Sequence, residues 1–238
     1  MFRNFATVVV LVLFAVPVSA CSGDDPDPLP VSVSAYLKGD AEPAAVEARI
    51  RAVPTVTSVA FVSRQEAYEQ FTKTFKDDPD LIASTKPEVM PQYFTVVVTE
   101  GSVGEAVQLV IGTLDGVEQT SLASGAGDVD RLEQAGVLVR LTAGVTDEQR
   151  AAVENLVRRL PRTEPARYET GEQTKARLLQ RCKGKGDLAA SLERVPAGDI
   201  PASFRFRVGL HGGKIPQLSD LQHLAGVAAM LIVPVEVV

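Results

Sequence analysis

Apolar and polar residues alternate in two short segments, one near the start of the chain and one near its middle. The apolar members of these segments are Val31, Val33, Ala35 and Leu37, and then Val137, Val139 and Leu141. Such alternation predicts a strand that is buried on one face. Behind each strand, apolar residues follow at helical spacing: Val46, Ile50 and Val53, and later Val153, Leu156, Val157 and Leu160. Each half of the chain therefore opens with a strand and an amphipathic helix.

The correspondence between the halves continues along the chain and indicates an internal duplication. Pro54 corresponds to Pro161, and Phe94 corresponds to Phe204. These matches keep their order while their separation grows by three residues, as small insertions in the second half would produce. We therefore expect two copies of one structural unit.

Each unit reads as strand, helix, strand, helical insertion, strand, helix and strand. The second strand is predicted over residues 56–62 and 166–169, and the third over 94–99 and 204–208. Capping-box spacing predicts helix starts at four pairs: Ser63 with Glu66, Ser102 with Glu105, Thr146 with Gln149, and Thr170 with Gln173. Without the insertion, this order is that of the split βαβ, ferredoxin-like fold.

We therefore predict an α+β fold of two tandem ferredoxin-like (split βαβ) domains, each with a helical lobe inserted between strands 2 and 3. In each domain, four antiparallel strands would carry two helices on one face. The expected domains span residues 31–121 and 136–238, with a glycine-rich linker over 122–135. The inserted segments, which we call the first lobe (64–90) and the second lobe (171–200), would project as small separate bodies.

The first 20 residues predict a secretory signal peptide. Arg3 provides a positive start, and residues 6–18 form an apolar run that is shorter than the ~20 residues a membrane-spanning helix needs. The small residues at 18–20, followed by Cys21, resemble the lipobox of bacterial lipoproteins. In that family the thiol of the cysteine receives a lipid, and cleavage leaves the cysteine as the new N-terminus. The alternatives are an ordinary signal peptide with an incidental cysteine and an uncleaved short anchor.

Residues 21–30 have the composition of a linker, which would hold a folded domain away from the membrane surface. We therefore expect a lipid-anchored protein on the outer face of the bacterial cell membrane, attached to the membrane through its lipid alone. Two or more acyl chains give stable anchoring, whereas one chain is marginal.

Composition excludes several classes of protein. With 45% hydrophobic and 23% charged residues, the chain is globular rather than disordered. Its net charge of -6 argues against nucleic-acid binding, which needs a basic surface. Two cysteines cannot form a disulfide framework, and no metal-binding motif is present. We expect no metal and no cofactor.

A search for catalytic residues finds no convincing site. His211 and His223 stand in no nucleophile or metal arrangement. Cys182 lies between Arg181 and Lys183, which would lower the pKa of its thiol, but no base stands at a recognisable spacing. We therefore expect Cys182 to pack within the second lobe. The chain is therefore predicted not to be an enzyme.

The first lobe is the candidate partner-binding site. A lobe of this size is too small to bury all of its apolar side chains, and exposed apolar patches often mark partner sites. The candidate contact residues are Tyr68, Phe71, Phe75, Leu81, Ile82 and Met90. The alternative is that they pack the lobe against its own sheet.

The second lobe has a different character, because it contains a basic run. The run consists of Lys175, Arg177, Arg181, Lys183 and Lys185. Residues 31–121 contain 7 basic and 13 acidic residues, whereas residues 122–238 contain 16 basic and 14 acidic ones. Either the two lobes bind different things, or one half docks on the other, or the basic run is a solvated helix face.

Several segments of the first half resemble the extracellular domain of the bacterial cell-division protein FtsX. They are residues 36–40, residues 59–67, and Pro91 with Phe94. In the second half Pro201 and Phe204 match well, while the opening of the lobe at 169–173 is degraded. The resemblance covers residues 31–238 as two tandem copies.

This resemblance implies a function in protein binding. FtsX proteins are permease-like subunits paired with a cytoplasmic ATPase, and their extracellular lobe docks peptidoglycan hydrolases or their activators. This chain has two such domains and no predicted permease helices, so we expect the binding role without the energy transduction. The expected partner is an envelope protein such as a peptidoglycan hydrolase or its activator. The alternative function is a small-ligand-binding lipoprotein that uses the cleft between the two domains; an envelope hydrolase is disfavoured.

Overall fold

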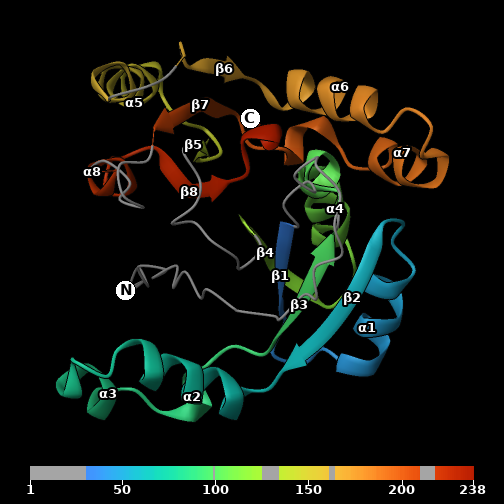
Figure 1. The fold of residues 1–238 in the computed structure, drawn as a ribbon, viewed down its shortest axis with the longest axis vertical. Coiled ribbons are helices and arrows are strands. Elements are labelled where there is room, and N and C mark those ends of the chain that lie inside the picture. Colours follow the sequence, from blue (N-terminus) through green and yellow to red (C-terminus); the bar gives the residue numbers. More distant parts are fainter. Residues whose placement is uncertain (1–30, 99, 125–133, 161–163, 210–217) are drawn as a thin grey trace, which may run out of the picture.

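The computed structural model describes residues 31–98, 100–124, 134–160, 164–209 and 218–238 (Figure 1). The expected signal peptide, Cys21 and the linker up to residue 30 lie outside the described residues, as do His211 and most of the glycine-rich stretch. Among the helices that the structure describes, none has the length and apolar character needed to cross a membrane.

The first domain is a four-stranded antiparallel sheet in the order β2-β3-β1-β4. Its elements are β1 (Val31–Leu37), α1 (Pro43–Arg51), β2 (Val56–Val62), α2 (Arg64–Thr74), α3 (Pro79–Ser84), the 3-10 helix η1 (Pro87–Val89), β3 (Tyr93–Val98), α4 (Gly101–Gly112) and β4 (Val117–Ser124). The first lobe consists of α2, α3 and η1 and lies between β2 and β3, as predicted.

The second domain repeats this topology in the order β6-β7-β5-β8. Its elements are β5 (Gln134–Leu141), α5 (Asp147–Arg159), β6 (Arg167–Glu169), α6 (Gly171–Arg181), α7 (Gly186–Glu193), the 3-10 helix η3 (Ala197–Asp199), β7 (Ser203–Gly209), α8 (Ser219–Gln222), β8 (Val227–Val233) and the 3-10 helix η4 (Val235–Val237). The predicted fold class is confirmed. Both β4 and β5 extend into the segment that we expect to be the linker.

Local sequence explains where most helices begin. Capping boxes form at Ser63, Thr146 and Thr170, which start α2, α5 and α6. The fourth predicted capping box is wrong: α4 begins after Glu100 without a side-chain cap, and Ser102 donates a hydrogen bond to the Glu100 carboxylate. Its other predicted member, Glu105, is buried in the contact between the domains instead.

Helix α4 is buried almost all the way around, because it packs on both domains. One side covers the first sheet, where it contacts β1, β3 and β4, and the other side contacts α6, α7 and η4. Only the ends and a few positions of α4 reach solvent; its buried residues are Gly101, Val103, Gly104, Glu105, Ala106, Val107, Gln108, Val110 and Ile111. Most of these buried residues are apolar, as in a helix of a protein interior, and the two polar ones, Glu105 and Gln108, face the second domain.

A single apolar cluster therefore spans the two domains. It joins Val31 and Val33 of β1 to α4, and then continues through Leu178 of α6 and Leu231 of β8. The face of the second sheet turned away from α5 and α8 contributes Leu138 to the same cluster. We expected each sheet to be covered on one face only, and the second sheet departs from this because the first domain covers its other face.

The two lobes occupy different surroundings. Figure 1 shows α2 and α3 extending away from the rest of the molecule, whereas α6 and α7 lie beside α4. The expectation of a projecting lobe is correct for the first copy. The second lobe is instead part of the contact between the domains.

Candidate functional site

The two lobes can be compared position by position, because both of their helices start at matching residues. Ser63 and Thr170 cap the first helix of each lobe, and Asp78 and Lys185 are the N-cap residues of the second helix. Both pairs are separated by the same number of residues as Pro54 and Pro161. A difference in burial between matching side chains therefore reflects the different surroundings of the two lobes.

An aromatic row runs along α2 in the first lobe. The rings of Tyr68 and Phe71 are 6.4 Å apart between centroids, and those of Phe71 and Phe75 are 4.8 Å apart. Phe71 is only 8% exposed, so it forms the floor of the row and is not a surface contact residue as we expected. Its neighbours Tyr68 and Phe75 cover it and remain half-buried.

Two apolar side chains of the first lobe are exposed. Leu81 on α3 is 36% exposed, and Val89 on η1 is 72% exposed. Ile82, the neighbour of Leu81, is half-buried. The sequence prediction included Leu81 and Ile82 but missed Val89, although a valine directly after Glu88 in an irregular charged segment is a visible sign of an exposed apolar residue.

Met90 belongs to the base of the lobe rather than to its exposed tip. It packs against a small cluster formed by Val62, Ala67 and Tyr93. The Tyr93 hydroxyl donates a 2.7 Å hydrogen bond to Oε1 of Gln70 on α2. Burial raises the pKa of Tyr93 to about 12, so this hydroxyl stays protonated and remains a donor. These contacts fix the lobe to the first sheet.

Equivalent positions of the second lobe are fully covered. Leu178, Cys182 and Leu188, which correspond to Phe71, Phe75 and Leu81, have 0% exposure and belong to the cluster around α4. Burial raises the pKa of the Cys182 thiol, so its basic neighbours do not activate it. The expected packing role of Cys182 agrees with its position.

A buried charge cluster joins the domains. Glu105 of α4 accepts hydrogen bonds of 2.6 and 3.0 Å from the guanidinium of Arg205 on β7, and one of 2.9 Å from Arg177 on α6. Arg140 on β5 lies 3.9 Å from the same carboxylate and donates to Gln108 of α4 at 2.6 Å. Burial alone would raise the pKa of Glu105, but the three arginines lower it to about 2.

A second carboxylate completes this cluster from within the second domain. Glu169 lies 2.8 Å from Nε of Arg205 and 3.0 Å from Nε of Arg177. Thr174 donates a further hydrogen bond to the Glu169 carboxylate. Glu169 therefore orients the two arginines so that their remaining nitrogens face Glu105. Each of these buried charges has a partner of opposite sign.

The basic run of the second lobe faces the first domain at several points. Lys185 pairs with Glu100 at the start of α4 with a 2.8 Å separation, and Arg181 donates to the backbone carbonyl of Ser102 on α4 at 3.5 Å. Burial lowers the pKa of Arg181. The hydrogen bond from Lys185 lowers the pKa of Glu100, because it stabilises the charged carboxylate. Of the three interpretations of this run, docking of one half on the other describes these contacts, although Lys183 is exposed.

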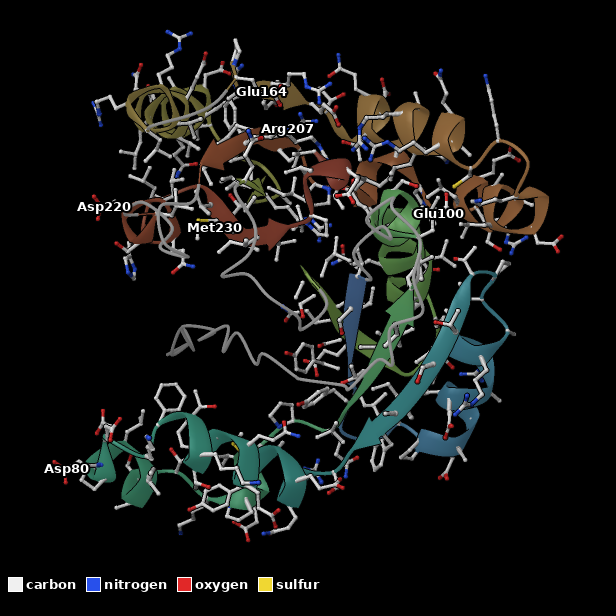
Figure 2. All side chains as sticks on the ribbon, viewed as in Figure 1. Asp80, Glu100, Glu164, Arg207, Asp220 and Met230 are labelled. Carbon is white, nitrogen blue, oxygen red and sulfur yellow. The ribbon has the colours of Figure 1, made fainter. Side chains whose placement is uncertain are left out.

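Figure 2 shows how far apart the two lobes lie. Asp80 marks the free end of the first lobe, while Glu100 lies where α4 meets the second lobe. No described residue of the second domain reaches Asp80 in this view, so the tip of the first lobe is turned outward.

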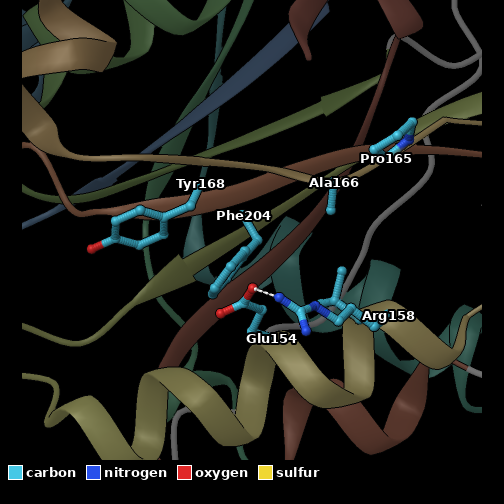
Figure 3. A pocket seen from close by; sticks show the side chains of 7 residues that line it. Glu154, Arg158, Pro165, Ala166, Tyr168 and Phe204 are labelled. Atoms are coloured by element: carbon cyan, nitrogen blue, oxygen red, sulfur yellow. Dashed lines mark hydrogen bonds and ion pairs between the residues drawn. The ribbon is translucent and has the colours of Figure 1, made fainter.

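A shallow pocket of about 330 Å³ lies on the second domain, away from both lobes. It is lined by α5 and the segment around β6, and Figure 3 shows Tyr168 and Phe204 beside the ion pair of Glu154 and Arg158. The expected ligand cleft was between the domains, but α4 packs against the second domain there.

Comparison with known protein families agrees with the resemblance that the first half of the chain shows. Residues 30–133 match the family model of the FtsX extracellular domain. Among solved structures, Extracellular Domain 1 (ECD1) of FtsX from S. pneumonie in complex with undecyl-maltoside is 18% identical, with a TM-score of 0.34; the similarity covers 42% of this chain and 99% of that chain. No curated protein matches this chain significantly. The match to the family model supports the FtsX resemblance over residues 30–133.

Proposed function

We propose, from the membership of residues 30–133 in the FtsX extracellular domain family, that this protein works outside the cytoplasm in cell division and binds a protein partner through its first lobe. The observation that supports this function most directly is the exposure of Leu81 and Val89 on a lobe whose counterpart in the second domain is covered. Exposed apolar side chains rimmed by charges are typical of protein interfaces.

The partner in this proposal is a peptidoglycan hydrolase or a protein that activates one, and the chain itself is not an enzyme. The family resemblance supports that class of partner. The second domain supports a scaffolding role, since its lobe is already engaged with α4. One lobe would then hold the protein together while the other binds the partner.

The proposal includes a lipid anchor on Cys21. The small residues before Cys21 support it, and the linker that follows would let the first lobe reach a partner near the membrane. Cys21→Ser should abolish incorporation of a palmitate analogue and release the protein from the membrane fraction. Retention of label in this variant would exclude Cys21 as the attachment site.

The binding role is tested by placing a photoreactive amino acid at Val89 and crosslinking in intact cells. We expect a peptidoglycan hydrolase or its activator to be the crosslinked protein, identified by mass spectrometry. Leu81→Asp should reduce this crosslink at least tenfold, because it puts a charge in the apolar patch.

Tyr168→Ala is the matched control, since Tyr168 is 37% exposed on the other domain, close to the 36% of Leu81. It should leave the crosslink unchanged. Both variants should remain folded at the temperature of the crosslinking experiment, which circular dichroism of the purified proteins checks, because each change is at a partly exposed side chain. A crosslink that survives Leu81→Asp would show that the first lobe is not the binding surface.

A further inference from the structure

The second lobe shows how a lobe of this fold holds another element. Helix α4 lies against α6 and α7, and the apolar contact is made by residues such as Leu178 and Leu188. At the edge of the contact, Lys185 pairs with Glu100 across 2.8 Å. These two residues are the N-cap residues of α7 and α4, so the second lobe binds a helix with an acidic N-terminal end.

The first lobe keeps the apolar part of this surface. Phe71 stands at the position of Leu178, and Leu81 stands at the position of Leu188. Leu188 is fully buried in the apolar cluster that includes α4, whereas Leu81 is 36% exposed. At Leu81 the first lobe therefore exposes part of the surface that α4 covers in the second domain, while Phe71 lies beneath Tyr68 and Phe75.

The charge at the edge of this surface is reversed. Asp78 is the N-cap residue of α3 in the first lobe, and Lys185 is the N-cap residue of the matching helix α7 in the second lobe. Arg177, which binds Glu105, is replaced by Gln70. Residues 64–90 contain four basic and six acidic residues, whereas residues 171–200 contain six basic and four acidic ones.

From this reversal we infer that the first lobe binds an apolar helix with lysine or arginine in its N-terminal turn, and rejects helices with the acidic charges of α4. This inference rests on the proposed function and specifies the chemistry of its partner. A helix seated like α4 would bring its N-terminal turn to Asp78, with Asp80 two residues further along in the first turn of α3. A cation there is attracted, and a glutamate such as Glu100 is repelled.

The reversal of charge also gives the two lobes of one chain different binding specificities. An acidic helix such as α4 fits the second lobe and is disfavoured by the first, so the first lobe of one molecule does not compete for α4 of another. An anionic membrane surface is disfavoured for the same reason, because the acidic tip of the lobe would be repelled by it.

The test uses the purified protein and two fluorescent helical peptides with identical apolar faces. One peptide carries two lysines in its first turn and the other carries two glutamates. Fluorescence anisotropy should show at least tenfold tighter binding of the lysine peptide at low salt, with a gap that narrows as salt screens the charges.

Variants of the lobe locate the effect. Asp78→Lys should remove or reverse the preference; because Asp78 also caps α3, Asp80→Lys serves as a second variant with the cap intact. Asp115→Lys, at an exposed position of the same domain, should leave the preference unchanged. Phosphatidylglycerol vesicles should bind more weakly than the lysine peptide.

Equal affinity for the two peptides, binding of neither, a preference that survives both lobe variants, or tighter binding to the vesicles would each overturn the inference. These outcomes are separable from failure of the proposed function. If Val89 crosslinks to a hydrolase but Asp80→Lys leaves that crosslink unchanged, the binding role stands and the charge preference is wrong.

Discussion

The carboxylate of Glu105 lies 2.6 Å from the guanidinium of Arg205, where the first domain meets the second, although the two residues are 100 positions apart in the chain. Glu105 is on the helix of one copy of the repeat, and Arg205 is on a strand of the other. The side chain of Arg205 is 1% exposed. This pair, with Arg177, links the two copies into a single folded unit rather than two independent domains.

Removing the carboxylate of Glu105 should destabilise the whole protein. In Glu105→Ala, Arg205 and Arg177 keep Glu169 but lose their shared partner, while Arg140 loses its nearest carboxylate. Breaking a buried ion pair on one side typically costs about 3–5 kcal/mol. Urea unfolding should show a loss of this size in a single transition.

The control for this variant is Glu148→Ala, which removes an exposed carboxylate from α5. It should change the free energy of unfolding by no more than about 0.5 kcal/mol. A loss below about 1 kcal/mol in Glu105→Ala would mean that the charge cluster does not hold the domains together.

Acid should lower the free energy of unfolding by protonating Glu105. The pKa of Glu105 is about 2 in the folded protein and near its ordinary value of 4.5 when unfolded. Because the folded pKa is the lower one, the stabilisation is complete above about pH 5 and is lost as the pH falls towards 2. The difference corresponds to about 3 kcal/mol.

This acid effect can be isolated by comparison with Glu105→Gln, which has no carboxyl group to protonate. Unfolding measured between pH 6 and pH 2 should show the wild-type protein approaching the variant as the pH falls. Parallel pH profiles for the two proteins would contradict the low pKa of Glu105.

The fold could be predicted from the sequence because its signals are local. Alternating apolar residues marked β1 and β5, and three capping boxes marked the correct helix starts. Glu105 was misread for the same reason: its spacing from Ser102 fits a capping box, and nothing nearby indicates that its partner is Arg205. Contacts between distant segments leave no periodic pattern in the chain.

The candidate site was only partly predictable. Composition identified the first lobe as rich in apolar side chains but did not separate Phe71, which is buried, from Leu81, which is exposed. That separation depends on how α2 and α3 pack. The basic run was compatible with three interpretations until α4 was seen to lie against it.

The second lobe should depend on the absence of a side chain at Gly171. A Cβ there would fall on the backbone carbonyl oxygens of Ala197 and Ile200, which cannot move without shifting η3. Gly171→Ala should cost about 1–3 kcal/mol, as overpacking does, and should loosen the lobe around Cys182. With Cys21 replaced by serine, the reaction of the Cys182 thiol with an aromatic disulfide reagent should be faster.

Arg64 occupies the matching position of the first lobe, which therefore serves as an internal control. Arg64→Ala should leave both the stability and the reactivity of Cys182 unchanged. Equal thiol reactivity in Gly171→Ala and wild type would show that the close approach of α6 to η3 is not needed for the lobe to cover Cys182.

The first lobe should open on its own when its aromatic floor is removed. Phe71 packs between Tyr68 and Phe75, so Phe71→Ala leaves a cavity in a lobe whose other contacts are few. Because the lobe projects from the first sheet, its loss need not unfold α4 or the second domain. Hydrogen exchange of α2 and α3 should rise by at least tenfold, while that of β1 and β5 stays unchanged. Val89→Ala, which shortens an exposed side chain of the same lobe, should leave exchange unaltered; faster exchange throughout the molecule in Phe71→Ala would show instead that the lobe and the domains unfold together.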